Sequence, residues 1–426
     1  MTILLRNGNL FTEKGATERD LLVSGGKLFV FEPGKAPTAD AERIIDLNNK
    51  YIIPGLTDVH VHFREPGFSY KETILTGSQA AAAGGYTCVL TMPNLDPVPS
   101  TLEGLKVQQD IIDRDACIHV IPYGTITQKQ DGRSHLSDME ALAPYVCAFT
   151  DDGKGVQDRA LMEEAMLRAK DLGKIIVAHC EDESLLGGTS IHDGRYAASI
   201  GHKGISSESE WRQVERDVEL AAKTGCAYHV CHVSTKESVE IIRQGKKSGV
   251  DVTCETGPHY LVLNDSKLQD EGRFKMNPPI RDIRDQEALL QGLLDGTVDI
   301  VATDHAPHSA EEKSKGILHS AFGIVGLECA FPVLFSSLVR YKIMPMEKLL
   351  QVMAINPRKR FGLPGGILED GAPADIAVID PATRYTIDAA SFRSMGHATP
   401  FDGREVTGKI LMTICGGEIV YEEASL

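Results

Sequence analysis

Long apolar runs and paired cysteines are both missing from this chain of 426 residues. No stretch approaches the roughly 18 consecutive apolar residues of a membrane-spanning helix, so we expect no membrane segment. The N-terminal sequence MTILLRNGNLF has only a short apolar stretch and no small-residue cleavage site, and we expect no signal peptide. The nine cysteines are scattered singly without a Cys-x-x-Cys pair, which argues against a disulfide framework and predicts a reduced, cytoplasmic protein.

Positive charge is also scarce. The chain has 44 Lys and Arg residues against 60 Asp and Glu residues, a net charge of −16. Such a surface repels phosphate backbones, so nucleic acid is not an expected partner. With 42% hydrophobic and 24% charged residues, the composition is that of an ordinary globular protein. An anionic small-molecule substrate would therefore need a local positive site on an acidic body.

The two ends of the chain share one sequence pattern. Residues 1–54 contain short alternating stretches (ILLRNG, DLLVSGGKLFVF, RIIDLNNKYII) broken by Gly, Asn and Pro, a pattern typical of small antiparallel strands. The same pattern returns within residues 366–426, in ADIAVID and GKILMTICGGEIVYE. We expect the two ends to pair into one small β-sandwich-like domain, and two unrelated terminal extensions are the alternative.

Residues 55–365 alternate between apolar strand patterns and helical patterns. Continuous apolar runs are typical of parallel strands that are covered on both faces. The strand predictions are 57–63, 86–92, 117–123, 147–150, 175–180, 228–233, 251–255 and 298–303. The helical patterns include 70–83, 159–172, 208–223 and 237–247. Eight strands with helical crossovers predict an α/β fold of the (β/α)8 barrel type, and a doubly wound open sheet is the alternative.

Histidines and aspartates stand where the predicted barrel strands end. In a strand, residues two apart lie on one face at roughly 7 Å, so His60 and His62 can approach one metal ion together. Further strands end in imidazole or carboxylate side chains, namely His179, His232, Asp304 and the pair Asp151 and Asp152. A single histidine at a strand end is usually a packing residue, but five strand ends that converge with zinc-type ligands predict a metal site.

This series of residues resembles the amidohydrolase superfamily. The segments PGLTDVHVH (54–62) and ADIAV (374–378) are similar to the superfamily's entry and exit segments. The resemblance implies a binuclear zinc site, with one ion on His60, His62 and Asp304 and the other on His179 and His232. Many members bridge the two ions with a carboxylated lysine on the fourth strand, where this chain has FTDDG (149–153).

The fourth strand leaves the bridging residue open. Strand alternation places Asp151 and Asp152 on opposite faces and cannot choose between them. The segment resembles bacterial dihydroorotases in which an aspartate bridges the metals, and that match implies Asp152. A carbamate on the nearby Lys154 is the minority alternative.

Three polar residues predict a clamp for a substrate carboxylate. Arg64 follows the histidine pair, and a guanidinium can hold a carboxylate through two parallel hydrogen bonds. Its ordinary alternative is a surface salt bridge to Glu65 or Glu72. Asn94 ends the second strand and can both donate and accept, and His308 lies one loop turn beyond Asp304.

The segments HFREPG, MPN and DHAPH, which carry this clamp, closely resemble the dihydroorotase family over nearly the whole chain. The resemblance adds Asn277, the backbone at Phe322 and Gly323, and His62 to the substrate contacts. It implies the reversible cyclisation of N-carbamoyl-L-aspartate to L-dihydroorotate, the third step of pyrimidine synthesis. The cofactor is then two zinc ions per subunit, bridged by Asp152 and a hydroxide whose proton passes to Asp304. A homodimer and an association with aspartate transcarbamoylase are further expectations from the family.

Two other functions remain open at this point. Hydantoinases and allantoinases share the metal pattern but act on other cyclic ureides, and non-catalytic scaffold subunits keep the barrel without the chemistry. We also expect Cys180 and Cys231, each next to a ligand histidine, to point away from the metals as small apolar filler.

Overall fold

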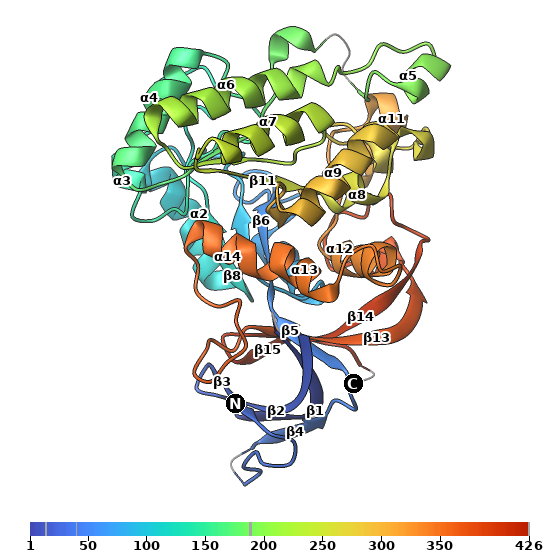
Figure 1. Cartoon of the computed structure of the whole chain (residues 1–426). Helices are drawn as coiled ribbons and strands as arrows, with labels where there is room; N and C mark the ends of the chain where they lie inside the picture. Colours follow the sequence, from blue (N-terminus) through green and yellow to red (C-terminus); the bar gives the residue numbers. More distant parts are fainter. Residues whose placement is uncertain (13–14, 40, 187–189, 425–426) are drawn as a thin grey trace.

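The computed structural model describes residues 1–12, 15–39, 41–186 and 190–424. Both ends of the chain lie in the lower part of Figure 1, where eight strands form one sheet in the order β15-β14-β13-β5-β1-β2-β3, with β4 paired to β1. The strands of this terminal sheet are β1 (Ile3–Thr12), β2 (Gly15–Ser24), β3 (Lys27–Phe31), β4 (Arg43–Asp46), β5 (Tyr51–Pro54), β13 (Ile376–Thr386), β14 (Glu405–Cys415) and β15 (Glu418–Glu422).

The predicted pairing of the chain ends is confirmed. Strand β5 runs antiparallel to β13, with Ile52 opposite Val378. Leu28 of β3 and Leu411 of β14 stand far apart in the strand order, yet they belong to one buried apolar cluster. The expected sandwich-like arrangement is therefore one sheet that curves around its own core. Burial of apolar side chains from both ends holds it together.

Two parallel sheets form the middle of the chain, in the orders β6-β7-β8 and β12-β11-β10-β9. Isolated parallel bridges connect them on both sides, through Phe149 with Gly124 and Ile176, and through Val61 with His305. The predicted strand at 147–150 is present only as isolated parallel bridges of Phe149 to Gly124 and Ile176, and backbone hydrogen bonds of this segment reach both neighbouring strands. Among the described residues, the parallel strands are β6 (Leu56–Val61), β7 (Tyr86–Thr91), β8 (His119–Pro122), β9 (Ile176–Ala178), β10 (Tyr228–Val230), β11 (Val252–Thr256) and β12 (Ile300–Val301).

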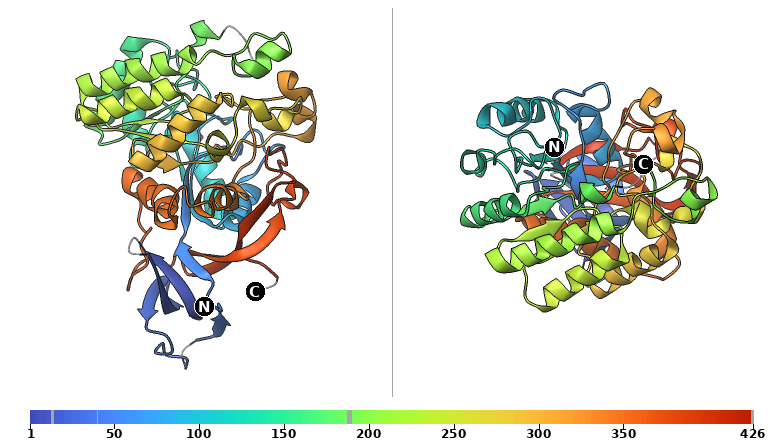
Figure 2. Two further views of the ribbon diagram at one scale, coloured as in Figure 1. Left: turned by 45° about the vertical axis from the view of Figure 1, so that its right-hand side comes forward. Right: turned by 90° about the horizontal axis from the view of Figure 1, so that it is seen from above.

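Helices surround these parallel strands when the molecule is seen from above (Figure 2). Several begin at side-chain caps: the oxygens of Thr73, Thr101, Asp158, Thr235 and Asp282 accept hydrogen bonds from backbone N–H groups of the first turn. The longer helices are α1 (Ile74–Ala83), α2 (Leu102–Asp115), α4 (Arg159–Asp171), α6 (Glu208–Thr224), α7 (Lys236–Lys247) and α9 (Ile283–Asp295). Every helix within the described ranges is too short or too polar to cross a bilayer.

Shorter helical segments complete the chain. The α-helical ones are α3 (Met139–Leu142), α5 (Arg195–Ser199), α8 (Pro258–Val262), α10 (Ala310–Lys313), α11 (Gly316–His319), α12 (Ala330–Leu334), α13 (Met346–Leu350) and α14 (Asn356–Phe361). The 3-10 turns are η1 (Glu183–Leu185), η2 (Asp265–Lys267), η3 (Gly272–Phe274) and η6 (Ala389–Ser391), and two π-helical turns are η4 (Phe335–Val339) and η5 (Gln351–Ile355).

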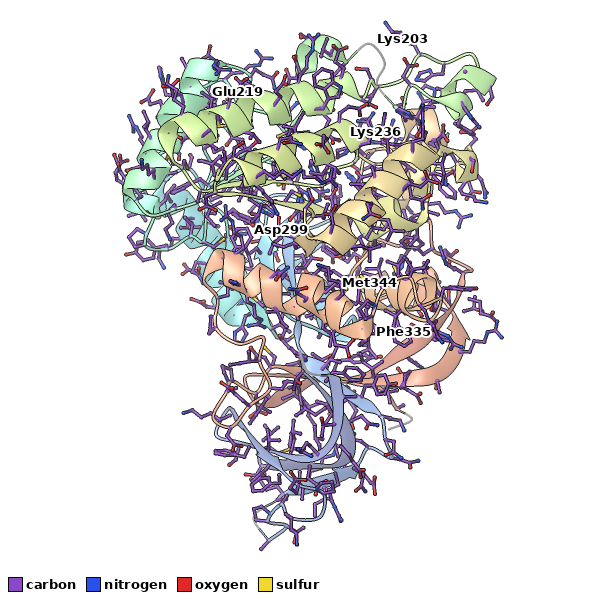
Figure 3. The ribbon with its side chains drawn as sticks, viewed as in Figure 1. Lys203, Glu219, Lys236, Asp299, Phe335 and Met344 are labelled. Carbon is purple, nitrogen blue, oxygen red and sulfur yellow. The ribbon has the colours of Figure 1, made fainter. Side chains whose placement is uncertain are left out.

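The segment α12–η4 joins the parallel-strand region to the terminal sheet. Phe335, labelled in Figure 3, stacks on Phe331 with ring centroids 5.7 Å apart. The same ring faces Gly408 of β14, where a Cβ would lie 2.7 Å from Phe335 Cδ1. Gly408 also has a φ of +89°, a backbone conformation that favours glycine. The close approach of the helical segment to the sheet therefore depends on this glycine.

Candidate functional site

Six predicted residues meet where the parallel strands end. His60 lies on β6, His62 follows it, and Asp152, His179, His232 and Asp304 lie on loops that follow parallel strands or the bridge at Phe149. All six side chains are buried. Donor atoms of His60, His62 and Asp304 lie within 4.8 Å of one another, and so do those of Asp152, His179 and His232. The structure thus brings together all the side chains that the sequence predicted as ligands.

Asp152 stands between the two groups. Its Oδ2 is 3.4 Å from Nε2 of His60 and 3.4 Å from Nε2 of His62. Its Oδ1 is 3.4 Å from Nε2 of His232 and 3.7 Å from Nδ1 of His179. Asp304 Oδ1 completes the first group, at 3.5 Å from His60 Nε2 and 3.2 Å from His62 Nε2. Each oxygen of Asp152 therefore faces one histidine pair.

Asp151 points elsewhere. Its Oδ1 accepts hydrogen bonds from the backbone N–H groups of Ile126 and Thr127, at 2.8 and 3.0 Å, and its Oδ2 accepts one from Gly132 N–H at 3.1 Å. These bonds hold the 126–132 loop. Lys154 is exposed and does not line the cavity that contains the cluster. The structure thus distinguishes two neighbouring aspartates that strand alternation left open.

The histidines of the cluster are oriented by partners behind them. His60 Nδ1 donates to Glu255 Oε1 at 2.6 Å, and the other oxygen of Glu255 binds His229 Nε2 at 3.1 Å. His62 Nδ1 donates to Asn94 Oδ1 at 2.9 Å. A carboxylate or amide oxygen behind a histidine sets its tautomer and leaves the opposite nitrogen free toward the cluster. Asn94 thus holds His62 in addition to lining the cavity.

A similar support holds His179. Glu181 Oε2 is 3.5 Å from His179 Nε2, and Glu181 Oε1 accepts a hydrogen bond of 3.0 Å from Asn277 Nδ2. Glu181 and Glu255 are not among the residues predicted from the sequence. Both could have been found, because Glu181 stands two residues after a predicted ligand and Glu255 ends a predicted strand. Paired carboxylates of this kind raise the basicity of the histidines they bind.

Three site residues adopt a backbone conformation that is rare outside glycine. Arg64, His232 and Asp304 have φ values of 61°, 31° and 49°. Such conformations cost of order 1–3 kcal/mol each and cluster at functional sites. Each one lies two or three residues beyond the end of its strand, since β6 ends at Val61, β10 at Val230 and β12 at Val301.

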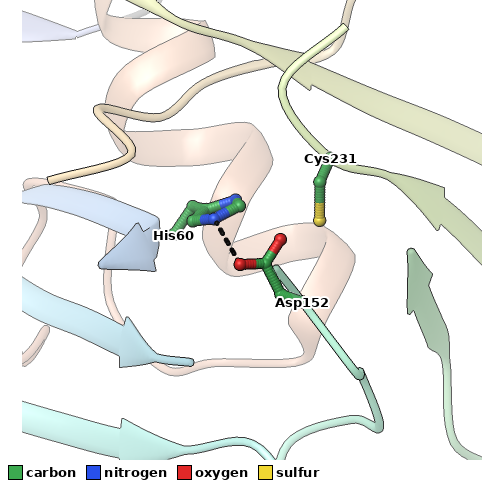
Figure 4. Close-up of side chains that lie close together, drawn as sticks. All are labelled: His60, Asp152 and Cys231. Carbon is green, nitrogen blue, oxygen red and sulfur yellow. Dashed lines mark ion pairs between the residues drawn. The ribbon is translucent and has the colours of Figure 1, made fainter. Parts of the chain in front are cut away.

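The expectation for Cys231 is wrong. Its Sγ lies within 4.8 Å of donor atoms of His60 and Asp152, and Figure 4 shows it beside this pair. Regular alternation ends at Val230, the last residue of β10, and the left-handed turn at His232 follows directly. Cys231 and His232 can therefore both face the cluster. Burial raises the pKa of the Cys231 thiol well above its usual value.

The cluster favours a bound cation. Nδ1 of His179 and Nε2 of His232 lie 2.9 Å apart, within hydrogen-bond distance of each other, and both nitrogens face Asp152 Oδ1. Buried His60 Nε2 and Asp152 Oδ1 have no hydrogen-bond partner among the described residues. Burial alone would lower the pKa of His179, but Asp152 and Glu181 outweigh it and raise that pKa to about 10. Imidazole and carboxylate donors that surround a spot favourable to positive charge fit a metal ion.

A cavity of about 210 Å³ opens above the cluster. Arg64 lies in one wall, buried and with a pKa that burial lowers to about 10, so the guanidinium stays charged at neutral pH. All but one of the predicted site residues line the cavity, and His60 lies beneath it. The lining comprises His62, Arg64, Asn94, Asp152, Gly153, His179, His232, Asn277, Asp304, Ala306, His308, Phe322 and Gly323.

Arg64 is anchored next to His308. Its Nε donates to Pro307 O at 3.3 Å, and its Nη2 is 3.4 Å from His308 Nε2. His308 Nε2 donates in turn to Phe322 O at 2.7 Å. Burial, together with the charges of Arg64 and Lys71, lowers the pKa of His308 to about 3, so this imidazole is neutral. The predicted clamp therefore comes together, with one fixed positive charge beside the acidic cluster.

The comparisons with known proteins agree with this geometry. Residues 49–238 match the family model described as Dihydro-orotase-like. A dihydroorotase of Fusobacterium nucleatum is 49% identical over 420 residues, which cover 98% of this chain and 98% of that protein. A dihydroorotase of Bacillus licheniformis is 47% identical over 429 residues and the two chains cover each other fully, at 100% each.

Among solved structures, an L-hydantoinase (dihydropyrimidinase) from Arthrobacter aurescens has a TM-score of 0.86 at 27% identity, covering 99% of this chain and 96% of that one. This likeness indicates an amidohydrolase-type fold of mixed α/β architecture with parallel strands. The curated relatives are considerably more similar in sequence and match over the whole length. The chain therefore belongs to the dihydroorotase family.

Proposed function

We propose that this chain is a metal-dependent cyclic-amide hydrolase that catalyses the reversible cyclisation of N-carbamoyl-L-aspartate to L-dihydroorotate, with release of water. This reaction is the third step of pyrimidine synthesis. One observation carries the proposal: a single cavity contains both the histidine–aspartate cluster and the buried guanidinium of Arg64. The cluster supplies hydrolytic chemistry, and the guanidinium selects a substrate that carries a carboxylate.

We also infer that the two parallel sheets close into a (β/α)8 barrel, which occupies residues 55–365. The bridges of Phe149 and the bridge between Val61 and His305 support the closure, because they connect the sheets on both sides. Residues 1–54 and 366–426 form the small β domain in this division. The placement of the cluster supports it too, since active sites of such barrels lie at the carboxyl ends of the strands.

The donor set divides into places for two zinc ions. His60, His62 and Asp304 would hold one, His179 and His232 the other, and Asp152 would reach both through its two oxygens. When bound, the ions lower the pKa of a water molecule toward about 7 and polarise an amide carbonyl. Glu255, Asn94 and Glu181 keep the ligand histidines in the orientation that this binding needs.

The protein's own groups bind the substrate and move its proton. Arg64 holds the substrate carboxylate, while His308, Asn94, Asn277 and the backbone at 322–323 shape the rest of the cavity. Burial would raise the pKa of Asp304, but the charge of His60 and the hydrogen bond from His62 hold it below its ordinary value. Asp304 is therefore a carboxylate at neutral pH. It can accept a proton at Oδ1 or Oδ2 and return it to the leaving ring nitrogen.

An assay with three substrates tests the proposal. Purified protein with its zinc counted by elemental analysis is supplied with dihydroorotate, hydantoin and allantoin side by side. We expect turnover of dihydroorotate with two zinc ions per chain, and at most weak turnover of the two ureides, which lack the carboxylate. Preferred turnover of hydantoin or allantoin would assign the chain to that activity. Absence of both zinc and turnover would point to a non-catalytic subunit.

Compartment and assembly complete the proposal. The scattered cysteines favour a reducing compartment, so we place the enzyme in the cytoplasm. A homodimer and an association with aspartate transcarbamoylase stay predictions from the family resemblance. Light scattering of the isolated chain, and of its mixture with aspartate transcarbamoylase, tests both.

A further inference from the structure

A second group of metal-type donors lies at the other end of the parallel strands. It contains His119, the first residue of β8, Asp375, which directly precedes β13, and Cys415, the last residue of β14. One donor atom from each lies within 4.8 Å of the others. None of the three lines the candidate active site. Because His119 begins its strand whereas the active-site residues follow strand ends, the two clusters lie at opposite ends of the parallel strands.

Asp375 is held so that one oxygen stays directed at His119. Its Oδ2 is 3.5 Å from Nη2 of Arg358. Its Oδ1 accepts a hydrogen bond of 2.8 Å from Gly416 N–H and is 3.4 Å from His119 Nε2. Arg358 thus fixes the carboxylate without occupying the side that faces the imidazole. The arrangement is built from three separate parts of the chain.

The histidine is the member of this group that is exposed to solvent. Asp375 and Cys415 are buried, but the His119 side chain is 51% exposed. An ion could therefore enter from solvent and keep a water molecule as its fourth ligand. Oδ1 of Asp375 lies 3.4 Å from His119 Nε2, so a negative oxygen already faces the ring nitrogen that would bind the ion.

The donors match the preferences of zinc. Thiolate, imidazole and carboxylate are the three zinc ligands of proteins, and bond lengths of about 2.0–2.3 Å in a tetrahedron place ligand atoms roughly 3.3–3.8 Å apart. The separations here exceed that range by about an ångström at most, which small side-chain rotations can close. The Cys415 thiol would release its proton on binding, as metal-bound cysteines do.

We propose that His119, Asp375 and Cys415 form a second cation site, selective for thiophilic divalent metals such as zinc. An ion in this site joins β8 of the parallel sheet to β13 and β14 of the terminal sheet. The ion would therefore stabilise the contact between the parallel-strand region and the terminal sheet without taking part in the reaction. The site is independent of the catalytic metals, because it shares no residue with them.

Cobalt(II) provides the test, because thiolate-bound cobalt(II) has a charge-transfer absorption in the near ultraviolet that nitrogen and oxygen ligands do not produce. Enzyme that carries only two zinc ions per chain, enough for the catalytic places, is titrated with one equivalent of cobalt(II). We expect the band to appear in the wild type and to vanish in Cys415→Ser. The matched control is Cys231→Ser, which removes the cysteine beside the catalytic cluster and should keep the band. His119→Asn, a change at an exposed ring, should weaken cobalt binding about tenfold or more.

The outcomes separate this site from the catalytic one. Dihydroorotate turnover should be unchanged in Cys415→Ser and His119→Asn, and thermal melting of each variant verifies that it is folded. No thiolate band in the wild type, or a band that survives Cys415→Ser and disappears in Cys231→Ser, would overturn the proposal. Loss of turnover in both variants while they remain folded would also contradict it.

Discussion

Arg64→Met tests the carboxylate clamp most directly. Methionine keeps most of the apolar stem and tolerates the left-handed backbone at this position no worse than arginine, so the change removes mainly the guanidinium. Arg64 Nε is committed to Pro307 O, which leaves the two terminal nitrogens for a substrate carboxylate. Hydrogen bonds to charged groups contribute about 1.5–3 kcal/mol each. Two such bonds amount to at least about 3 kcal/mol, or roughly a 100-fold loss of affinity.

The assay is steady-state hydrolysis of dihydroorotate, followed by ultraviolet absorbance as the ring opens, with zinc counted on the same preparation. We expect KM to rise about 100-fold by the same arithmetic, kcat to change far less, and zinc content to stay normal. Lys71→Met is the matched control. It removes a positive charge 3.3 Å from His308 Nδ1, yet Lys71 does not line the cavity.

A change of only a few-fold in KM is expected for this control, because the removed charge makes no direct bond to substrate. An unaltered KM in Arg64→Met would refute the clamp. Equal losses in Arg64→Met and Lys71→Met would show that net charge, and not the guanidinium geometry, binds the carboxylate. A fall in zinc content in Arg64→Met would mean that the arginine supports the metal site.

Four further changes probe other parts of the site. Asp152→Ala removes the carboxylate that faces both histidine pairs, so bound zinc should fall by at least one ion per chain and activity should be lost; elemental analysis that finds unchanged zinc would contradict the bridge. Glu255→Gln leaves His60 without its charged partner and should weaken metal binding about 10–100-fold in a chelator competition, with Glu237→Gln, a surface change, as control. Lys313 donates to the carbonyls of Lys275, Ala321 and Gly323 at 3.1, 2.7 and 2.6 Å. Lys313→Met should therefore loosen the cavity wall at residues 322–323, which raises KM and lowers Tm. A lower Tm with an unchanged KM would show that Lys313 contributes to folding stability but not to substrate binding. His308, with a pKa of about 3, becomes charged only as pH falls through that value. The shape of the pH profile of kcat/KM between about pH 5 and pH 9 should therefore be the same in wild type and His308→Gln.

Much of the site could be predicted because its side chains stand at strand ends. An apolar run that ends in His179, His232 or Asp304 predicts both a parallel strand and a ligand residue at its carboxyl end, where the active sites of such folds lie. The pairing of the chain ends could be predicted for a similar reason, since both carry short alternating strands with an apolar face that needs a partner. The local pattern of apolar residues is sufficient to predict an element wherever burial of its apolar face alone decides its position.

Local pattern failed where the backbone leaves regular geometry. Alternation directed Cys231 away from the cluster, but the strand ends at Val230 and the left-handed turn at His232 changes the direction. The predicted strand at 147–150 is present only as the bridges of Phe149, and the loop that follows it carries Asp152 to both histidine pairs. Hydrogen bonds to residues distant in sequence decide such turns, and no local window contains them.

The sequence by itself determined the ligand chemistry, the acidic body with one arginine at the site, and the alternation of strands and helices. Those properties follow from residue type and spacing. Only the tertiary structure decided that Asp152 serves the cluster while Asp151 holds a loop, and that Glu255 and Glu181 stand behind the histidines. The physical reason is that a carboxylate's role depends on which donors surround it, and those donors come from segments that only the folded chain brings together.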